Sequence, residues 1–227
     1  MNIIKILIPI ILIIAIKAQT INFSSNLVSG DGFQVNDNII ILTEYDCSWR
    51  CRSDFVLTGT NIDKSIIVSK SATLYLDSLT LASTGKLTPL IIDNNCEVKL
   101  ELEGTSSFVD SSTNENGGII FLREGAKLKI SGKGTLNLMI NSLVAINGDN
   151  STSLELNGGN IKIFSTENSA GGLNITEGII FIGPTFTYEA LSGKNPAISA
   201  GSLIIINSGN FNIKSGEGKV FQTRDSK

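Results

Sequence analysis

The sequence predicts an all-β chain that winds into a right-handed parallel β-helix, a single-stranded β-solenoid of about six to seven rungs of roughly 25 residues. Two observations predict this fold. Beyond residue 60, three short strand-like segments recur about every 25 residues. Within these segments apolar and polar residues alternate, as in strands with one buried face, and no apolar stripe of helical period is sustained beyond the leader.

Each repeat is expected to contain three short strands joined by turns. The opening strands are predicted at 66–68, 90–92, 120–122, 144–146, 173–175 and 196–198. After a polar corner, the first triplets are predicted at 74–76, 98–100, 128–130, 154–156, 180–182 and 203–205. The second triplets follow at 79–81, 136–138, 161–163, 186–188 and 211–213, and the second repeat is irregular at 104–108. Turns such as Gly158-Gly159 leave too little chain for a helix in each repeat.

A β-sandwich is the main alternative, because it also places turns at short, regular spacing. It does not require the same pattern to recur in register, whereas a parallel coil does. In a coil each strand stacks on its counterpart in the next turn, and the inward side chains form ladders along the axis. The recurrence therefore favours the coil.

The ends of the chain differ from the repeat. Residues 1–18 combine a basic residue, an apolar run of about eleven residues and Ala18 at the cut, which is typical of a signal peptide; an uncleaved anchor is the alternative. The sequence therefore predicts a secreted, extracellular protein. Residues 19–64 are expected to form an N-terminal cap with the first irregular strands, because solenoid ends must be covered. The β-helix is expected over 65–227, with a truncated C-terminal end.

Cysteines and glycosylation sequons both fit an oxidising compartment. The three cysteines predict one disulfide and one free thiol: Cys47 with Cys51 would close a short loop, and Cys96 with either of them is the alternative. Three sequons begin at Asn22, Asn150 and Asn174. Because the chain has no histidine and only three cysteines, a structural zinc site is not expected.

The charge balance argues against nucleic acid as a partner. The formal net charge is −3, and removal of Lys5 and Lys17 with the leader would make it −5. A basic face is therefore not expected. After signal cleavage, no membrane partner is expected either.

Four segments carry a family resemblance. They are 55–59, 102–108, 130–136 and 154–161, which read FVLTG, LEGTSSF, ISGKGTL and LELNGGNI. Over roughly residues 55 to 222 the chain resembles a family of secreted carbohydrate-binding parallel β-helices. The resemblance implies a pectate-lyase-like fold and binding of plant-type polysaccharides, in some members with calcium. Here the corners at 69–71, 93–95 and 147–150 hold only two carboxylates, so we expect no cofactor, with calcium as the alternative.

Catalysis is not expected. Glycoside hydrolysis needs two carboxylates about 5–10 Å apart, and the outward column of the first triplets holds one acid: Tyr75, Lys99, Lys129, Glu155, Phe181 and Ile204. Lys99 and Lys129 are predicted to stack on neighbouring turns and to bind an acidic sugar, but no aspartate cluster accompanies them to hold the metal of a lyase. The absence of histidine excludes Ser-His-Asp and Cys-His nucleophile systems.

Two further columns are candidates for recognition. The outward residues of the second triplets match hydroxyls repeating along a glycan, with an ordinary solvent face as the alternative: Thr80, Asn137, Lys162, Thr187 and Asn212. The outward residues of the opening strands are Ile67, Ile91, Phe121, Ala145, Asn174 and Ala197. The first three predict an exposed apolar strip used for contact, unless part of the chain folds over it or the register is off by one.

Together these features predict a non-catalytic extracellular module that binds a polysaccharide or cell-surface glycan along one face of the β-helix. Two alternatives stay open at this point. One is a structural or adhesive surface protein that self-associates, and the other is a degenerate polysaccharide lyase.

Overall fold

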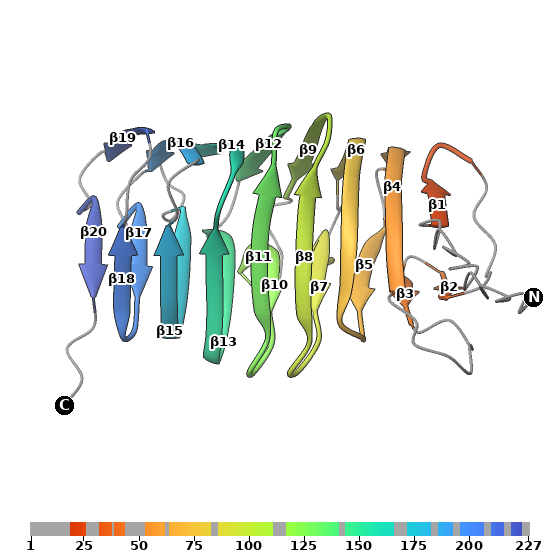
Figure 1. Cartoon of the computed structure of the whole chain (residues 1–227), viewed down its shortest axis with the longest axis horizontal. Coiled ribbons are helices and arrows are strands. Elements are labelled where there is room, and N and C mark those ends of the chain that lie inside the picture. Colours follow the sequence, from red (N-terminus) through yellow and green to blue (C-terminus); the bar gives the residue numbers. More distant parts are fainter. Residues whose placement is uncertain are drawn as a thin grey trace, which may run out of the picture.

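The strands of this protein lie side by side along one long axis (Figure 1). The computed structural model describes residues 19–25, 32–37, 39–43, 53–61, 64–82, 86–110, 117–140, 144–165, 172–182, 186–192, 196–206, 210–215 and 219–223. In this part of the chain, no helix has the length and apolar character needed to cross a bilayer.

Three faces of strands follow one another in each turn, and we call them the opening, middle and closing faces. The opening face consists of β3 (Ile39–Leu42), β5 (Ser65–Val68), β7 (Leu90–Ile92), β10 (Gly118–Leu122), the first parts of β13 (Val144–Leu156) and β15 (Leu173–Ile182), β17 (Ile198–Ala200) and β20 (Phe221–Thr223). The middle face consists of β1 (Gln19–Asn22), the first parts of β4 (Ser53–Asn61) and β6 (Ala72–Ala82), β8 (Glu97–Leu102), β11 (Lys127–Gly132), the later parts of β13 and β15, and β18 (Leu203–Ile206). The closing face consists of the ends of β4 and β6, β9 (Thr105–Val109), β12 (Thr135–Ile140), β14 (Gly159–Ser165), β16 (Phe186–Ser192) and β19 (Asn210–Ser215).

Parallel pairing joins each strand to its counterpart in the next turn. Along the opening face, the partners of Ile40 continue through Ile66 and Leu90 up to Phe221, at intervals of 23 to 30 residues. Among the described strands, only β2 (Phe33–Asn36) pairs antiparallel, with β3. The predicted parallel coil with a repeat of roughly 25 residues is confirmed; its right-handed winding stays a prediction.

The core is built from inward ladders of aliphatic side chains. Leu100, Ile130, Leu156 and Ile182 are successive partners on the middle face, and each is fully buried. Burying one such side chain contributes about 1.5–3 kcal/mol. Because residues alternate between the two sides of a strand, these ladders determine which neighbouring side chains point outward.

The register differs from the predicted one at several positions, mostly by two residues. Ala145 and Ala197 are buried, and Asn147 and Ser199 take the outward positions predicted for them. In β18, Ile205 rather than Ile204 aligns with the outward column. A shift of two residues keeps the alternation of apolar and polar positions. The sequence pattern alone therefore does not reveal such a shift.

The polar corners between the opening and middle faces share one backbone conformation. Asn95, Gly125 and Ser151 occupy equivalent corner positions and have φ of 58°, 71° and 59°. This left-handed region favours glycine and tolerates asparagine better than most other residues. The repeated corner therefore explains why polar residues and glycine recur there.

The N-terminal part predicted as a cap contains β1, β2, β3 and β4. The predicted signal segment 1–18 lies outside the described residues, as do Cys47 and Cys51. The short-loop disulfide therefore stays a prediction.

Candidate functional site

The predicted polar column lies on the closing face, with one correction. Successive partners there are Thr80, Ser107, Asn137, Lys162, Glu189 and Asn212. Thr187 is wrong as a member of this column, because it pairs with Asn160 and Asn210 in the neighbouring one. The sequence pattern missed Ser107 in the irregular repeat and Glu189, which stands two residues after Thr187.

The closing face also exposes apolar side chains that sequence reasoning did not single out. Met139 and Phe164 are partners on β12 and β14 and are 46% and 41% exposed. They lie two residues beyond Asn137 and Lys162 on the same strands, so they point outward as well. Polar and apolar columns therefore run next to each other on this face.

The exposed apolar strip predicted on the opening face is wrong for two of its three residues. Ile67, Ile91 and Phe121 are partners, as predicted. Ile91 is only 6% exposed and Phe121 only 9%, while Ile67 is half-buried. β7 and β10 are buried at every position, so these strands are covered on both sides, and covered parallel strands read as continuous apolar runs.

Lys99 and Lys129 are partners on the middle face, where β8 meets β11. Each ammonium group has a carboxylate partner that the column prediction did not include. Lys99 Nζ lies 2.8 Å from Glu101 Oε2 on its own strand, and Lys129 Nζ lies 3.2 Å from Glu155 Oε1 on β13. The stacked lysines therefore belong to a charge-balanced surface rather than to a basic one.

Glu101 is the best-connected carboxyl group of this surface. Ser131 Oγ donates a hydrogen bond to Glu101 Oε2 at 2.7 Å, in addition to the contact with Lys99. Burial raises the pKa of Glu101, but these hydrogen bonds and the charges of Lys99 and Lys129 outweigh it. The pKa of Glu101 therefore lies below its ordinary value of 4.5.

A hollow of about 380 Å³ lies on the middle face across four successive strands. Its lining comes from β4, β6, β8 and β11 and from the corner before β6: Asp54, Ser71, Ala72, Thr73, Glu97, Val98, Lys99 and Lys129. One carboxylate oxygen of Asp54, Oδ1, is buried without a hydrogen-bond partner among the described residues. The hollow thus combines hydrogen-bond donors with acceptors, one of which is unsatisfied.

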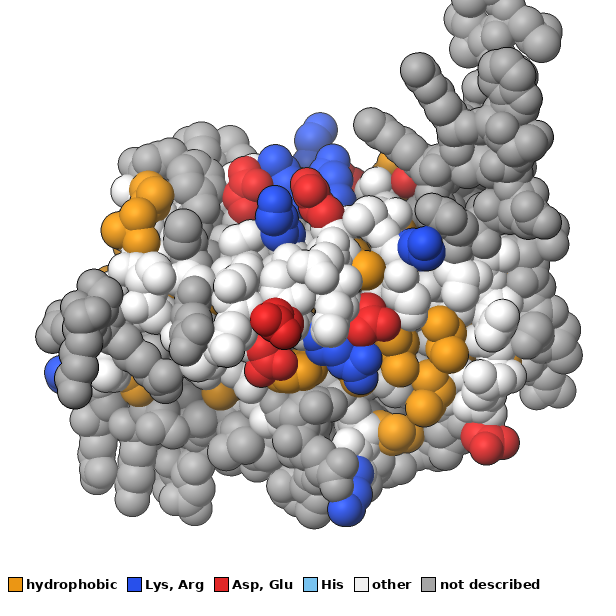
Figure 2. Space-filling view, turned by 90° about the horizontal axis from the view of Figure 1, so that it is seen from below, with side chains coloured by type: hydrophobic (Ala, Val, Ile, Leu, Met, Phe, Trp, Pro, Cys, Tyr) orange, Lys and Arg blue, Asp and Glu red, His pale blue; other side chains and the backbone are white. Residues whose placement is uncertain are grey.

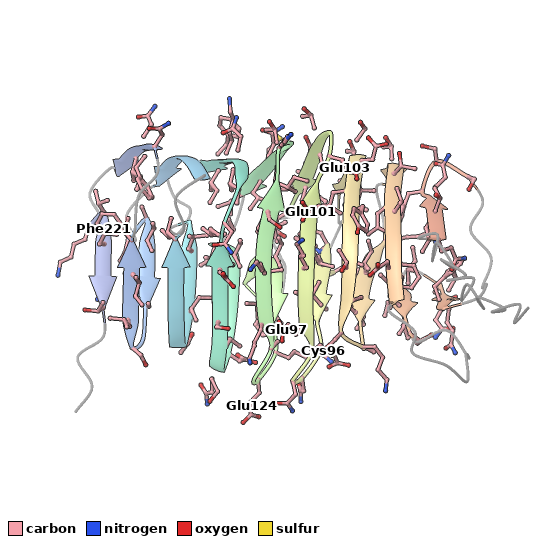
Figure 3. The ribbon with its side chains drawn as sticks, in the orientation of Figure 1. Cys96, Glu97, Glu101, Glu103, Glu124 and Phe221 are labelled. Atoms are coloured by element: carbon pink, nitrogen blue, oxygen red, sulfur yellow. The ribbon has the colours of Figure 1, made fainter. Side chains whose placement is uncertain are left out.

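The charged side chains near this surface are mixed in sign. Figure 3 shows Glu97 and Glu101 along β8, with Glu103 at the corner that follows and Glu124 at a corner on the opposite side. In the view from below, acidic and basic side chains lie next to one another instead of forming patches of one sign (Figure 2). The arrangement suits hydrogen bonding to a ligand with many hydroxyl groups, because hydroxyls both donate and accept.

The corner that most resembles a cation site contains an arginine. Arg123 Nη1 donates to Asp93 Oδ1 at 2.8 Å. Burial raises the pKa of Asp93, but the hydrogen bond and charge of Arg123 outweigh it, so the pKa lies below the ordinary value of 3.8. No group of three or more acidic, cysteine or histidine side chains capable of holding a metal lies in the described part of the chain. A guanidinium occupies the place beside Asp93, so this corner does not fit calcium, which prefers six to eight oxygen ligands.

Cys96 is a buried free thiol at the corner before β8. The alternative that pairs it with Cys47 or Cys51 is therefore wrong. Burial and the nearby charge of Asp93 raise the pKa of the Cys96 thiol, while Lys70 opposes them. A buried thiol with a raised pKa is chemically inert, so Cys96 belongs to the packing rather than to a reactive site.

The three sequons lie at differently accessible positions. Asn150 is exposed at the corner within β13, and Asn22 is exposed at the end of β1. Asn174 is half-buried in β15, and its Nδ2 donates to Asn147 Oδ1 at 2.8 Å. Glycosylation stays a prediction at all three sites, and exposure favours Asn150 and Asn22.

Comparisons with known proteins add a family and a fold. A family model described as carbohydrate-binding domain-containing protein matches residues 49–226. Among solved structures, the chain is similar to a polysaccharide lyase-like protein from C. thermocellum, determined as a gadolinium derivative. The two share 20% identity with a TM-score of 0.58, over 91% of this chain and 94% of that one. At this identity the likeness shows the fold alone. No curated protein matches the chain.

Proposed function

This chain belongs to the family of carbohydrate-binding domain-containing proteins, and from that premise we propose that it is a secreted, non-catalytic module that binds a polysaccharide laid across its middle face. The observation that carries the choice of face is the hollow that crosses β4, β6, β8 and β11. Ligand sites in proteins are typically concave and hold a few convergent polar groups. The outer columns of the other faces offer polar side chains but no described hollow of this kind.

The spacing of the strands supports an extended glycan as the ligand. Neighbouring strands lie about 4.8 Å apart, which is close to the length of one pyranose ring along an extended chain. A glycan that runs along the coil axis would therefore meet a new strand at about every sugar. Thr73, Lys99 and Lys129 occupy the same position on successive strands, so they would meet successive sugars.

The same contacts argue against catalysis. A lyase needs a neutral amine or another base to remove a proton beside a neutralised uronate. Both stacked lysines hold carboxylate partners, which favour the charged ammonium form. The degenerate lyase therefore finds no support in these residues. The self-associating alternative also loses its main support, because Ile91 and Phe121 are buried.

Secretion follows from the leader-like segment 1–18, and the sequons fit the same route. The closing face is the second candidate surface for the glycan. It is favoured by the adjacent exposed side chains of Met139 and Phe164 beside the polar column.

Two matched substitutions on one strand distinguish the two faces. Thr73 points outward into the hollow from the first part of β6, and Thr80 points outward from its second part on the closing face. Thr73→Met fills the hollow without changing charge, and we expect it to weaken polysaccharide binding about tenfold. Thr80→Met makes the same chemical change on the other face and is expected to leave binding unchanged.

The measurement is retention of the secreted protein on insoluble and immobilised polysaccharides, with circular dichroism to verify folding. A folded wild-type protein that no polysaccharide retains would contradict the proposed function. Loss of binding in Thr80→Met alone would move the site to the closing face.

A further inference from the structure

The charged groups of the middle face are paired where a ligand would meet them, and we infer that its ligand is an uncharged glycan rather than a polyuronate. This inference rests on the proposed function and specifies its substrate class. It replaces the expectation that Lys99 and Lys129 bind an acidic sugar.

The balance of charge on this surface is negative. Five carboxylates stand at the outward positions of the middle-face strands from β4 to β13: Asp54, Asp77, Glu97, Glu101 and Glu155. Three ammonium groups stand among them: Lys99, Lys127 and Lys129. The strip therefore carries a net charge of −2, and the whole chain carries −3. A polyanion approaching it meets repulsion rather than electrostatic steering.

The individual contacts lead to the same conclusion at short range. A uronate that reached Lys99 Nζ would also approach Glu101 Oε2, which lies 2.8 Å from that nitrogen. The same holds at Lys129, where Glu155 Oε1 lies 3.2 Å away. Each attraction to an ammonium group is thus opposed by a carboxylate within one hydrogen-bond length. Like charges placed together in this way disfavour the wrong partner.

Sugar hydroxyls meet no such opposition. A hydroxyl donates to a carboxylate and accepts from an ammonium group, so one hydroxyl can bridge a Lys–Glu pair. The unsatisfied Oδ1 of Asp54 at one end of the hollow likewise calls for a donor and disfavours an anion. Every polar group described in the hollow is therefore compatible with an uncharged glycan.

The experiment releases the two lysines from their partners. In the double variant Glu101→Gln/Glu155→Gln the strip loses two negative charges, while both side chains keep their length. We expect wild-type protein to bind neutral glucans and to show little affinity for polygalacturonate at about 0.15 M salt. The double variant is expected to bind polygalacturonate about tenfold more tightly at low salt, and this gain is expected to shrink as salt rises.

A matched control separates local pairing from net charge. Glu103→Gln/Glu124→Gln removes two exposed carboxylates outside the strip and changes the total charge equally. A gain in polygalacturonate binding that is confined to the first double variant supports the inference. An equal gain in both variants, or wild-type protein that binds polygalacturonate as tightly as neutral glucan, overturns it and leaves the proposed function standing. A folded wild-type protein that binds neither polymer overturns the proposed function itself.

Discussion

At Glu101, burial and hydrogen bonding act on one carboxyl group in opposite directions. Burial favours the protonated form, whereas Lys99, Ser131 and Lys129 favour the carboxylate and prevail. The folded state therefore binds this proton less tightly than the unfolded state does. Such a group stabilises the fold above its unfolded pKa, which is near 4.5, and the contribution is lost as the pH falls through the folded pKa.

This sign gives a residue-scale prediction. Glu101→Gln is expected to lower the free energy of unfolding by about 0.5 kcal/mol at pH 7, because Lys99 is exposed and the solvent screens the pair. The difference from wild type is expected to vanish between about pH 5 and pH 2. Urea unfolding at a series of pH values measures it.

Glu103→Gln serves as the control, since it removes an exposed carboxyl at the next corner. It is expected to change stability less than Glu101→Gln does. If the difference between Glu101→Gln and wild type grew as the pH fell, the direction assigned to the pKa of Glu101 would be wrong.

Single-residue patterns predicted part of this surface and missed the rest for one physical reason. The stacking of Lys99 on Lys129 follows from equal positions in two triplets, and the structure has it. Their partners depend on side-chain reach. Glu101 approaches Lys99 along the same strand, while Glu155 approaches Lys129 from the next turn. Triplet positions alone do not distinguish these two routes.

At the scale of the element, corners limit sequence more strictly than strands do. Gly132 ends β11, has φ of 106°, and pairs with Leu102. A Cβ atom there would lie 2.3 Å from the carbonyl oxygen of Leu102 and 2.6 Å from its nitrogen. Both atoms belong to the backbone, so neither can move aside as a flexible side chain would.

Gly132→Ala is therefore expected to cost about 3 kcal/mol in the free energy of unfolding. Lys133→Ala in the same corner is the matched control and is expected to change stability by less than about 0.5 kcal/mol, because Lys133 is exposed. Urea midpoints of the two variants give the comparison. Equal midpoints would mean that the corner relaxes without strain.

Strand positions were predictable from the sequence where apolar and polar residues alternate, as in β8 and β11. The pattern failed in the opening strands. Leu90, Ile91 and Ile92 are all buried, so nothing in that run distinguishes the inward side from the outward one. The exposed apolar strip was predicted for this reason, and the same ambiguity placed Ala145 and Ala197 in the wrong register.

At the scale of the whole molecule, the recurrence of the pattern made the parallel coil predictable. Each turn contacts mainly its neighbours, so the stability of a solenoid is close to a sum of turns and the interfaces between them. β8 has parallel partners on both sides, β6 and β11. Within the described residues, β18 pairs with β15 alone and β20 with β17 alone.

Burial follows the same gradient along the axis. The inward residues Val98, Leu100 and Ile130 are fully buried, whereas Ile206 and Phe221 hold equivalent inward positions in their ladders and are 42% and 44% exposed. Opening the last described turn breaks one interface, while opening β8 breaks two. Local unfolding is therefore expected to be easiest at β18, β19 and β20.

Hydrogen exchange of the 227-residue chain tests this gradient. Amides of β18 and β20 are expected to exchange on the order of a hundredfold faster than those of β8 and β11 under native conditions. A pair of core truncations provides an independent measure: Ile130→Ala is expected to cost about 2–5 kcal/mol, and Ile206→Ala less, because its side chain is already partly exposed. Uniform exchange along the axis, together with equal costs for the two truncations, would show that the coil unfolds as one cooperative unit instead of opening from one end.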